Sequence, residues 1–368
     1  MIVFWKFSTS FTIIIISYNL MLCAQSNLQL KQVNVLFRHG DRTPDTLYPG
    51  IPYTNEDYFP AGIGGLTNHG KLRAFKFGET LRQRYNDFLG STYITRDVVA
   101  QSSDFERTKM TLQLVLAGLY PPDGLQTWKN DLNWQPIPFR SIYPITKDYI
   151  FRRFDVCQRY LEEEKRILNL SEVTKRLSRF NYLIKNMTNE TKKNLTDVAH
   201  LRIFYCNLVC LKAMGFKLPQ WAKNNHLQND LLSAAIASFD LMSYNNELKK
   251  INGGGFVKIF TENMLAVKNQ TSKATSKINL YSGHDMNILA LYSALNLGKS
   301  HISEFSSAII VELHQQETNY YVKIWYFLGV PSEMKQMQIP NCPILCPLEC
   351  FLHQTKSVLP TDEEFKCV

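Results

Sequence analysis

An apolar run that ends in a dense cluster of charged residues constrains the fold of this chain more than any other feature. Four of the five residues from Val33 to Phe37 are apolar, which is typical of a strand buried on both faces of a sheet. The sequence RHGDR follows at once, so the charges begin where this strand ends. Because ligands bind at the carboxyl ends of strands in open α/β sheets, we expect Arg38, His39 and Arg42 to lie on a ligand-binding turn.

The side chains of this turn favour a phosphate ligand. Arg38 and Arg42 carry planar forks of donors that match phosphate oxygens. Nearby positive charge lowers the pKa of a histidine, so His39 can remain neutral between them and act as a nucleophile. The alternative is a basic turn that only contacts carboxylates. Three such side chains within five residues make that alternative the weaker hypothesis.

Strand-turn-helix units recur along the chain. Short apolar runs at residues 97–100 and 277–282 predict strands, and each run precedes a polar turn and a helical pattern. Residues 308–313 and 320–327 predict an antiparallel hairpin that closes the sheet. Thr67 is expected to cap the helix that follows the first turn.

Polar residues occupy the turns after the predicted strands. Because the carboxyl ends of parallel strands meet at one edge of a sheet, we expect His39, Gln101, His284 and Asp285 to share one crevice. A His-Asp pair alone is a weak signal, and its position at the end of a core strand is what favours catalysis.

Two charged residues in the turn QSSDFERT have structural interpretations. Asp104 can cap the helix that follows this turn. For Arg107, a structural ion pair is the stronger hypothesis and a ligand contact is the weaker one.

The chain changes character between residues 151 and 252. Strand-like runs vanish there, and segments with helical patterns replace them. We therefore predict a helical cap inserted into an α/β core, whose first part covers residues 25–150 and whose second part covers residues 253–368 with a cysteine-rich tail. The three glycines at 253–255 predict a flexible joint after the cap.

The N-terminal segment and the glycosylation motifs predict export. Residues 1–24 form a secretory signal pattern, and their apolar run is interrupted before it reaches the roughly 18 residues that a membrane span needs. N-glycosylation motifs follow at Asn169, Asn186, Asn189, Asn194 and Asn269. We expect a secreted glycoprotein without a membrane span. The net charge of +9 is scattered among acids, so a nucleic-acid partner is not expected.

Two motifs carry a resemblance to a known family. RHGDRTP resembles the RHGxRxP signature of the histidine acid phosphatases, and YSGHDMN resembles their second signature. The resemblance continues through GGLTNHG, SSDFERT, LYPPDG, WQPIP and PNCPILCPLE. It is similar to the prostatic and lysosomal type and to insect venom acid phosphatases.

The resemblance implies a fold and a division of roles. The fold is a doubly wound, mainly parallel α/β core of the phosphoglycerate mutase type with an inserted helical cap. His39 is implied as the nucleophile that forms a phosphohistidine, with Arg38, Arg42 and His284 on the phosphate oxygens and Asp285 as the acid for the leaving group. A phosphate monoester is the implied substrate, no metal or other cofactor is implied, and a homodimer is expected from the resemblance alone.

Gln101 stands where we align an arginine of the family that contacts phosphate. Glutamine can still donate a neutral hydrogen bond, so we expect a weakened or substrate-shifted phosphatase, and Gln101→Arg should raise turnover. The alternative is a secreted noncatalytic protein that binds phosphate in the same pocket. A phytase-like or mutase-like enzyme would keep the same residues and change the substrate.

The cysteine-rich tail is expected to form disulfides. Cys342, Cys346 and Cys350 have regular spacing, but prolines interrupt it and no histidine pair accompanies it, so a metal site is the weaker interpretation. The resemblance implies a bridge between Cys342 and Cys346.

The other cysteines leave one partner open. Seven cysteines follow the predicted signal, so at least one thiol has no partner within the chain. The resemblance implies a bridge between Cys157 and Cys367. Cys206 lacks its partner in the family, which leaves Cys210 or Cys350 as alternatives.

Overall fold

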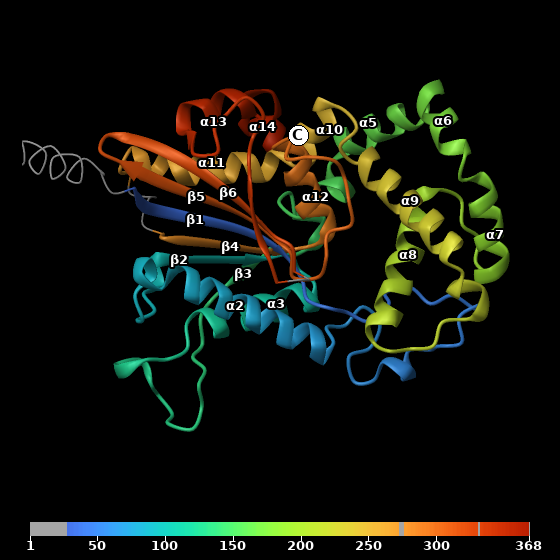
Figure 1. The fold of residues 1–368 in the computed structure, drawn as a ribbon, viewed down its shortest axis with the longest axis horizontal. Helices are drawn as coiled ribbons and strands as arrows, with labels where there is room; N and C mark the ends of the chain where they lie inside the picture. The colour runs from blue at the N-terminus through green and yellow to red at the C-terminus, as the bar shows by residue number, and fades with distance from the viewer. Residues whose placement is uncertain (1–27, 272–275, 330–331, 368) are drawn as a thin grey trace, which may run out of the picture.

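A mixed sheet forms the centre of the molecule (Figure 1). The computed structural model describes residues 28–271, 276–329 and 332–367, so the predicted secretory signal lies outside the described residues. The strand order is β3-β2-β4-β1-β5-β6-β7, with β8 paired to β6. The strands are β1 (Gln29–Arg38), β2 (Val98–Ser102), β3 (Arg140–Ser141), β4 (Ile278–Gly283), β5 (Ala308–Gln316), β6 (Asn319–Phe327), β7 (Met334–Met337) and β8 (Cys346–Pro347).

The two halves of the sheet differ in strand direction. β3, β2, β4 and β1 run parallel to one another. On the other side of β1, each of β5, β6 and β7 pairs antiparallel with the strand before it in the sheet. The strands expected at residues 97–100 and 277–282 and the C-terminal hairpin are therefore confirmed.

Helices cover both faces of the sheet, as a doubly wound α/β fold requires (Figure 1). α2 (Asn68–Leu89) and α3 (Glu106–Leu119) lie on one face, and α11 (Gly254–Lys268), α12 (Asp285–Ala294) and α13 (Leu348–Thr355) lie on the other. Val33, Val35 and Phe37 pack toward α2 and α3, whereas Leu36 packs toward α11 and α12. The apolar run that opens the core is thus buried on both faces, as predicted.

The first helices begin in different ways. Thr67 caps α2 as expected, because its Oγ1 accepts a hydrogen bond from the backbone N–H of Gly70 at 3.0 Å. The prediction for Asp104 is wrong. α3 has Phe105 at its N-cap, and the Asp104 carboxylate accepts a hydrogen bond from Lys109 Nζ at 3.3 Å.

Every regular element between residues 153 and 252 is helical. These are α4 (Arg153–Val156), α5 (Gln158–Leu168), α6 (Ser171–Ser178), α7 (Asn181–Thr191), α8 (Val198–Ala213), α9 (Asn225–Leu241) and α10 (Asn246–Asn252). Their shared apolar cluster also takes in Tyr48, Ile51 and Tyr58 from the loop after the charged turn. This loop therefore packs against these helices, which we call the cap. The boundaries of the cap at residues 151 and 252 stay a prediction.

Short elements complete the described chain. They are η1 (Glu56–Tyr58), η2 (Thr95–Asp97), η3 (Gly124–Gln126), η4 (Ile145–Lys147), η5 (Gln220–Lys223), η6 (Lys356–Val358) and α14 (Asp362–Phe365). Among the described residues, every helix is too short or too polar to cross a bilayer.

The triple glycine is not a flexible joint. Gly253 ends α10 and α11 begins at Gly254, and all three glycines are buried. A Cβ atom at Gly253 would lie 2.0 Å from the carbonyl oxygen of Ala290, and one at Gly254 would lie 2.1 Å from that of Val358. The glycines therefore allow close backbone packing.

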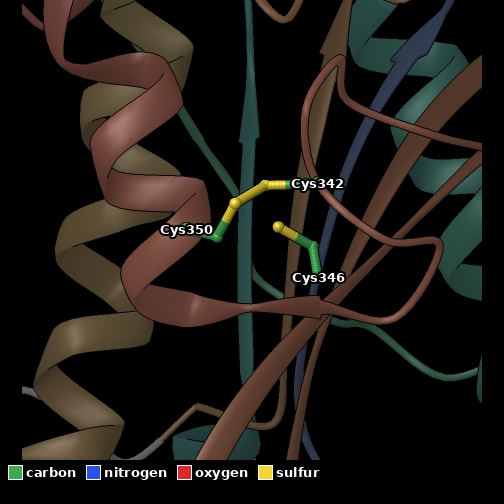
Figure 2. A group of neighbouring side chains, drawn as sticks. All are labelled: Cys342, Cys346 and Cys350. Atoms are coloured by element: carbon green, nitrogen blue, oxygen red, sulfur yellow. A yellow bond between two sulfur atoms is a disulfide. The ribbon is translucent and has the colours of Figure 1, made fainter.

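The tail has a different disulfide from the one implied by the resemblance. The bridge between Cys157 and Cys367 is confirmed. Cys342, however, bonds to Cys350, and Cys346 remains a buried free thiol. Figure 2 shows the reason: Cys350, on the first turn of α13, faces Cys342, and Cys346 lies beside their bond. All three sulfur atoms lie within 4.8 Å of one another.

Both alternatives for Cys206 are wrong in this structure. Cys206 and Cys210 are buried free thiols on α8, and Cys350 already has a partner. Residues four apart on a helix have Cβ atoms about 5–6 Å apart, which exceeds the 3.5–4.5 Å of a disulfide.

Peptide mapping tests the tail bridge. In protein alkylated before digestion, cleavage after Lys335, Glu349 and Lys356 separates Cys350 from Cys342 and Cys346. The Cys342–Cys350 bridge keeps the two peptides linked until reduction, and Cys346 carries the alkyl group. Separate peptides with alkylated Cys350 would instead show the Cys342–Cys346 pairing.

Candidate active site

The register of two parallel strands brings two distant histidines together. Arg38 at the end of β1 lies opposite Gly283 at the end of β4, so His39 and His284 follow side by side. The backbone N–H of His39 donates to the carbonyl oxygen of Gly283 at 3.0 Å. The two imidazole rings have centroids 5.5 Å apart in an edge-to-face arrangement.

Close backbone packing fixes the turn that carries His39. A Cβ atom at Gly40 would lie 2.3 Å from the carbonyl oxygen of Gly70, and one at Gly70 would lie 2.2 Å from that of Asp41. Only glycine allows this approach of the turn to α2.

His39 is held as a neutral imidazole with one free nitrogen. Its Nδ1 lies 2.8 Å from the carbonyl oxygen of Gly40, and because a carbonyl only accepts, Nδ1 carries the proton. Burial lowers the pKa of His39 well below its usual value, and Arg107 and Arg38 add to this effect. The lone pair of Nε2 is therefore available for attack.

Arg38 joins the histidine turn to Asp285. Its Nη2 lies 3.2 Å from the Asp285 carboxylate, its Nη1 donates to the Ser303 carbonyl, and its guanidinium lies 4.0 Å from the Phe305 ring centroid. Burial raises the pKa of Asp285, but Arg38, followed by Arg202, outweighs it and brings this pKa below the usual value. Asp285 thus carries its proton only under acid conditions or when Arg38 is drawn away.

His284 is fixed by hydroxyl groups that sequence reasoning did not single out. Its Nε2 lies 2.9 Å from Ser103 Oγ, which in turn lies 2.9 Å from Thr108 Oγ1. Burial and the neighbouring arginines, led by Arg107, lower the pKa of His284 well below its usual value. Like His39, it stands as a neutral ring.

One cavity joins most of the predicted site residues. His39, Arg42, His284 and Asp285 line a cavity of about 580 Å³. Arg38 is not among the lining residues, but it contacts the cavity residue Asp285 through their ion pair. The structure does not bring Gln101 there. Gln101 is half-buried within β2 opposite Tyr281, and it is absent from the described residues that line the cavity.

Arg107 lies in the cavity instead, and the prediction of a structural ion pair for it is wrong. Its Nη1 lies 3.5 Å from the Gly64 carbonyl oxygen and its guanidinium lies 4.6 Å from the Phe105 ring centroid. Within the described part of the chain, no carboxylate pairs with it. Burial, helped by Arg42, lowers its pKa to about 10, so Arg107 stays charged at neutral and acid pH.

One arginine of the cavity differs from its neighbours because it forms no ion pair. Arg42 pairs with Asp45 at 2.9 Å, and the Arg152 guanidinium pairs with Asp155. Arg107 forms no such pair with any described carboxylate, although the charges of Asp45 and Asp285 act on it from farther away. A half-buried cation without an ion pair favours an anionic ligand. The sequence contained a signal for the role of Arg107, which lies in the first turn of α3. A positive charge there interacts unfavourably with the helix dipole, which indicates that the charge serves another purpose.

Comparisons with known proteins agree with this geometry. The model of the histidine phosphatase superfamily (branch 2) matches residues 29–326. The chain is 43% identical to the venom acid phosphatase of Apis mellifera over 92% of this chain and 88% of the relative. It is 33% identical to the human lysosomal acid phosphatase over 92% and 80%.

The fold also resembles a solved structure. A Hafnia alvei phytase in complex with tartrate has a TM-score of 0.69, covering 94% of this chain and 99% of that one. Its sequence identity is 18%, so this likeness concerns the fold alone.

Removing the charge of Arg107 tests its effect on His39. Arg107→Gln should raise the pKa of His39 toward the ordinary value, because one source of positive charge disappears. NMR titration of isotope-labelled histidine rings, with His39→Gln for assignment, measures this pKa. Arg96→Gln serves as the control, because that side chain is 76% exposed before the start of β2. An unchanged or lower pKa in Arg107→Gln would contradict the described position of Arg107.

Proposed function

Because this chain belongs to the histidine phosphatase superfamily (branch 2) and is an acid phosphatase, we propose that it hydrolyses phosphate monoesters through a phosphohistidine formed at His39. The observation that carries this proposal is the neutral His39 ring, with its free Nε2 directed by the Nδ1 bond to the Gly40 carbonyl. Covalent catalysis then divides one difficult displacement into two easier ones.

In the first step, Nε2 of His39 attacks phosphorus and the P–O bond to the leaving group breaks. Arg38, Arg42, Arg107 and His284 hold the phosphoryl oxygens, whose charge the arginines offset. Arg107 has no competing carboxylate partner among the described residues, so we assign it the contact that the sequence suggested for Gln101.

Asp285 supplies the proton to the leaving oxygen. The ion pair between Asp285 and Arg38 opposes this role, because the positive charge of Arg38 favours the deprotonated form of Asp285. A phosphoryl group that draws Arg38 away weakens the ion pair, so substrate binding raises the pKa of Asp285 and acid pH helps to protonate it. In the second step water attacks phosphorus and gives a proton to the Asp285 carboxylate. The bond between phosphorus and Nε2 of His39 breaks, which releases inorganic phosphate and returns the free imidazole.

The noncatalytic alternative rested on Gln101. Gln101 lies away from the cavity lining and Arg107 lies in it, so the position of Gln101 gives that alternative no support. For the same reason we no longer expect Gln101→Arg to raise turnover. The similarity to phytases concerns the fold, so it is no evidence that this chain acts on the substrate of a phytase.

We also propose that the protein is secreted. The signal pattern at residues 1–24 and the venom relative support export, although lysosomal relatives exist too. Asn169, Asn189, Asn194 and Asn269 are exposed, which suits glycan attachment. The homodimer rests on the family resemblance alone, and sedimentation of the purified protein measures it.

Loss of the nucleophile should abolish turnover. His39→Ala should lower kcat on p-nitrophenyl phosphate at acid pH by at least about 10³-fold, because the covalent step disappears. Rapid quenching with labelled substrate should also trap an acid-labile, alkali-stable phosphoenzyme in the wild type only. His226→Ala is the matched control, since His226 is exposed on the cap. Equal turnover in His39→Ala and the wild type would refute the proposal.

Loss of the acid should depend on the leaving group. Asp285→Asn should lower kcat on an alkyl phosphate by about 10²–10⁴-fold, because an alkoxide needs a proton to leave. The same variant should lose far less on p-nitrophenyl phosphate, because p-nitrophenolate leaves without one. A parallel loss on both substrates would argue that Asp285 has another role.

A further inference from the structure

The cavity continues from the catalytic residues into the cap, where apolar side chains line it together with charged and polar ones. The cap helices α5, α6, α8 and α9 supply this wall. Its main apolar side chains, which we call the cap slot, are Leu168, Leu177, Val198, Ile203, Leu241 and Met242. A substrate whose phosphorus lies at His39 therefore has its leaving group within the part of the cavity that contains the cap slot.

The charged groups in this wall already have partners. Asp155 pairs with Arg152, and Asp197 accepts a hydrogen bond from the backbone N–H of His200 at 3.0 Å. Arg202 donates from Nε to Ser238 Oγ at 3.1 Å. No lysine lines the cavity among the described residues. Beyond the catalytic end, Arg202 is thus the main cation that further phosphate groups would meet.

A half-buried carboxyl group also lies in the wall. Glu164 accepts a hydrogen bond from the Tyr160 hydroxyl at 3.4 Å, and burial raises its pKa. At acid pH Glu164 is therefore more readily neutral than an exposed glutamate. At higher pH Glu164 is ionised and, together with Asp155 and Asp197, repels a polyanion. A hydrocarbon leaving group carries no charge and is not repelled.

We infer that the cap slot selects phosphate monoesters with a single phosphate and an apolar leaving group, of alkyl or aryl chemistry, over polyphosphorylated polyols. This inference rests on the proposed function, since it concerns the same cavity. Selection follows from the hydrophobic effect, because each methylene that enters the slot leaves water.

A homologous series of n-alkyl phosphates tests this on the wild-type enzyme. From ethyl to hexyl phosphate the basicity of the leaving oxygen hardly changes, so kcat/KM reports contact with the leaving group. A fully buried methylene is worth about 0.8 kcal/mol, or about 4-fold, so partial burial should give at least about 10-fold from ethyl to hexyl. We expect kcat/KM for myo-inositol hexakisphosphate to be lower than kcat/KM for hexyl phosphate.

A bulky residue in the slot provides the matched variant. Ala199 lines the slot on α8, and Ala213 is exposed at the end of the same helix. Ala199→Trp should bring the ratio of hexyl to ethyl phosphate close to one, whereas Ala213→Trp should keep the wild-type ratio. If thermal melts show that Ala199→Trp does not fold, Ile203→Ser should lower the same ratio.

The outcomes separate the two proposals. A flat alkyl series, or a preference for the hexakisphosphate, in an enzyme that loses activity with His39→Ala would overturn the slot inference alone. Absence of hydrolysis of every monoester, or hydrolysis that survives His39→Ala, would instead overturn the proposed function.

Discussion

The parallel pairing of β1 with β4 is the constraint on which the site depends. The backbone pairing of Arg38 with Gly283 places His39 beside His284, although these residues are far apart in the sequence. A slip of one residue would turn each side chain of one strand to the other face. Asn34 and Asn279 lie opposite each other in this register, and the Asn279 amide donates to Asn34 Oδ1 at 3.1 Å. A slip would break this buried hydrogen bond, so the polar pair inside the core helps to set the geometry of the catalytic residues.

Charge balance gives the site its chemistry. Carboxylates pair with Arg38, Arg42 and Arg152, whereas Arg107 has no such partner within the described residues. Burial, together with Arg107, Arg38 and Arg42, keeps His39 neutral, which a nucleophile needs. The Arg38–Asp285 pair links the two halves of the mechanism, because a phosphoryl group on Arg38 changes the proton affinity of the acid.

The sequence predicted what depends on local patterns. The buried strand before Arg38 follows from apolar periodicity, and the junction of His39 with His284 and Asp285 follows from the edge rule for parallel sheets. Each strand and its polar turn is specified within a few residues, and the parallel sheet then joins turns that are far apart in the sequence.

The sequence did not predict the features that depend on the direction of a side chain. Gln101 and Arg107 belong to one polar turn, and only the described geometry distinguishes the residue inside β2 from the one that α3 directs into the cavity. The tail bridge depends in the same way on the first turn of α13, which directs Cys350 rather than Cys346 to Cys342. Spacing along the chain does not encode either direction.

A crystal structure with orthovanadate, which mimics the phosphoryl group in transfer, tests the central claim most directly. The account predicts vanadium bonded to Nε2 of His39, with equatorial oxygens on Arg38, Arg42 and Arg107 and the apical oxygen facing Asp285. Vanadate bound away from His39, or with Arg107 directed out of the site, would contradict it.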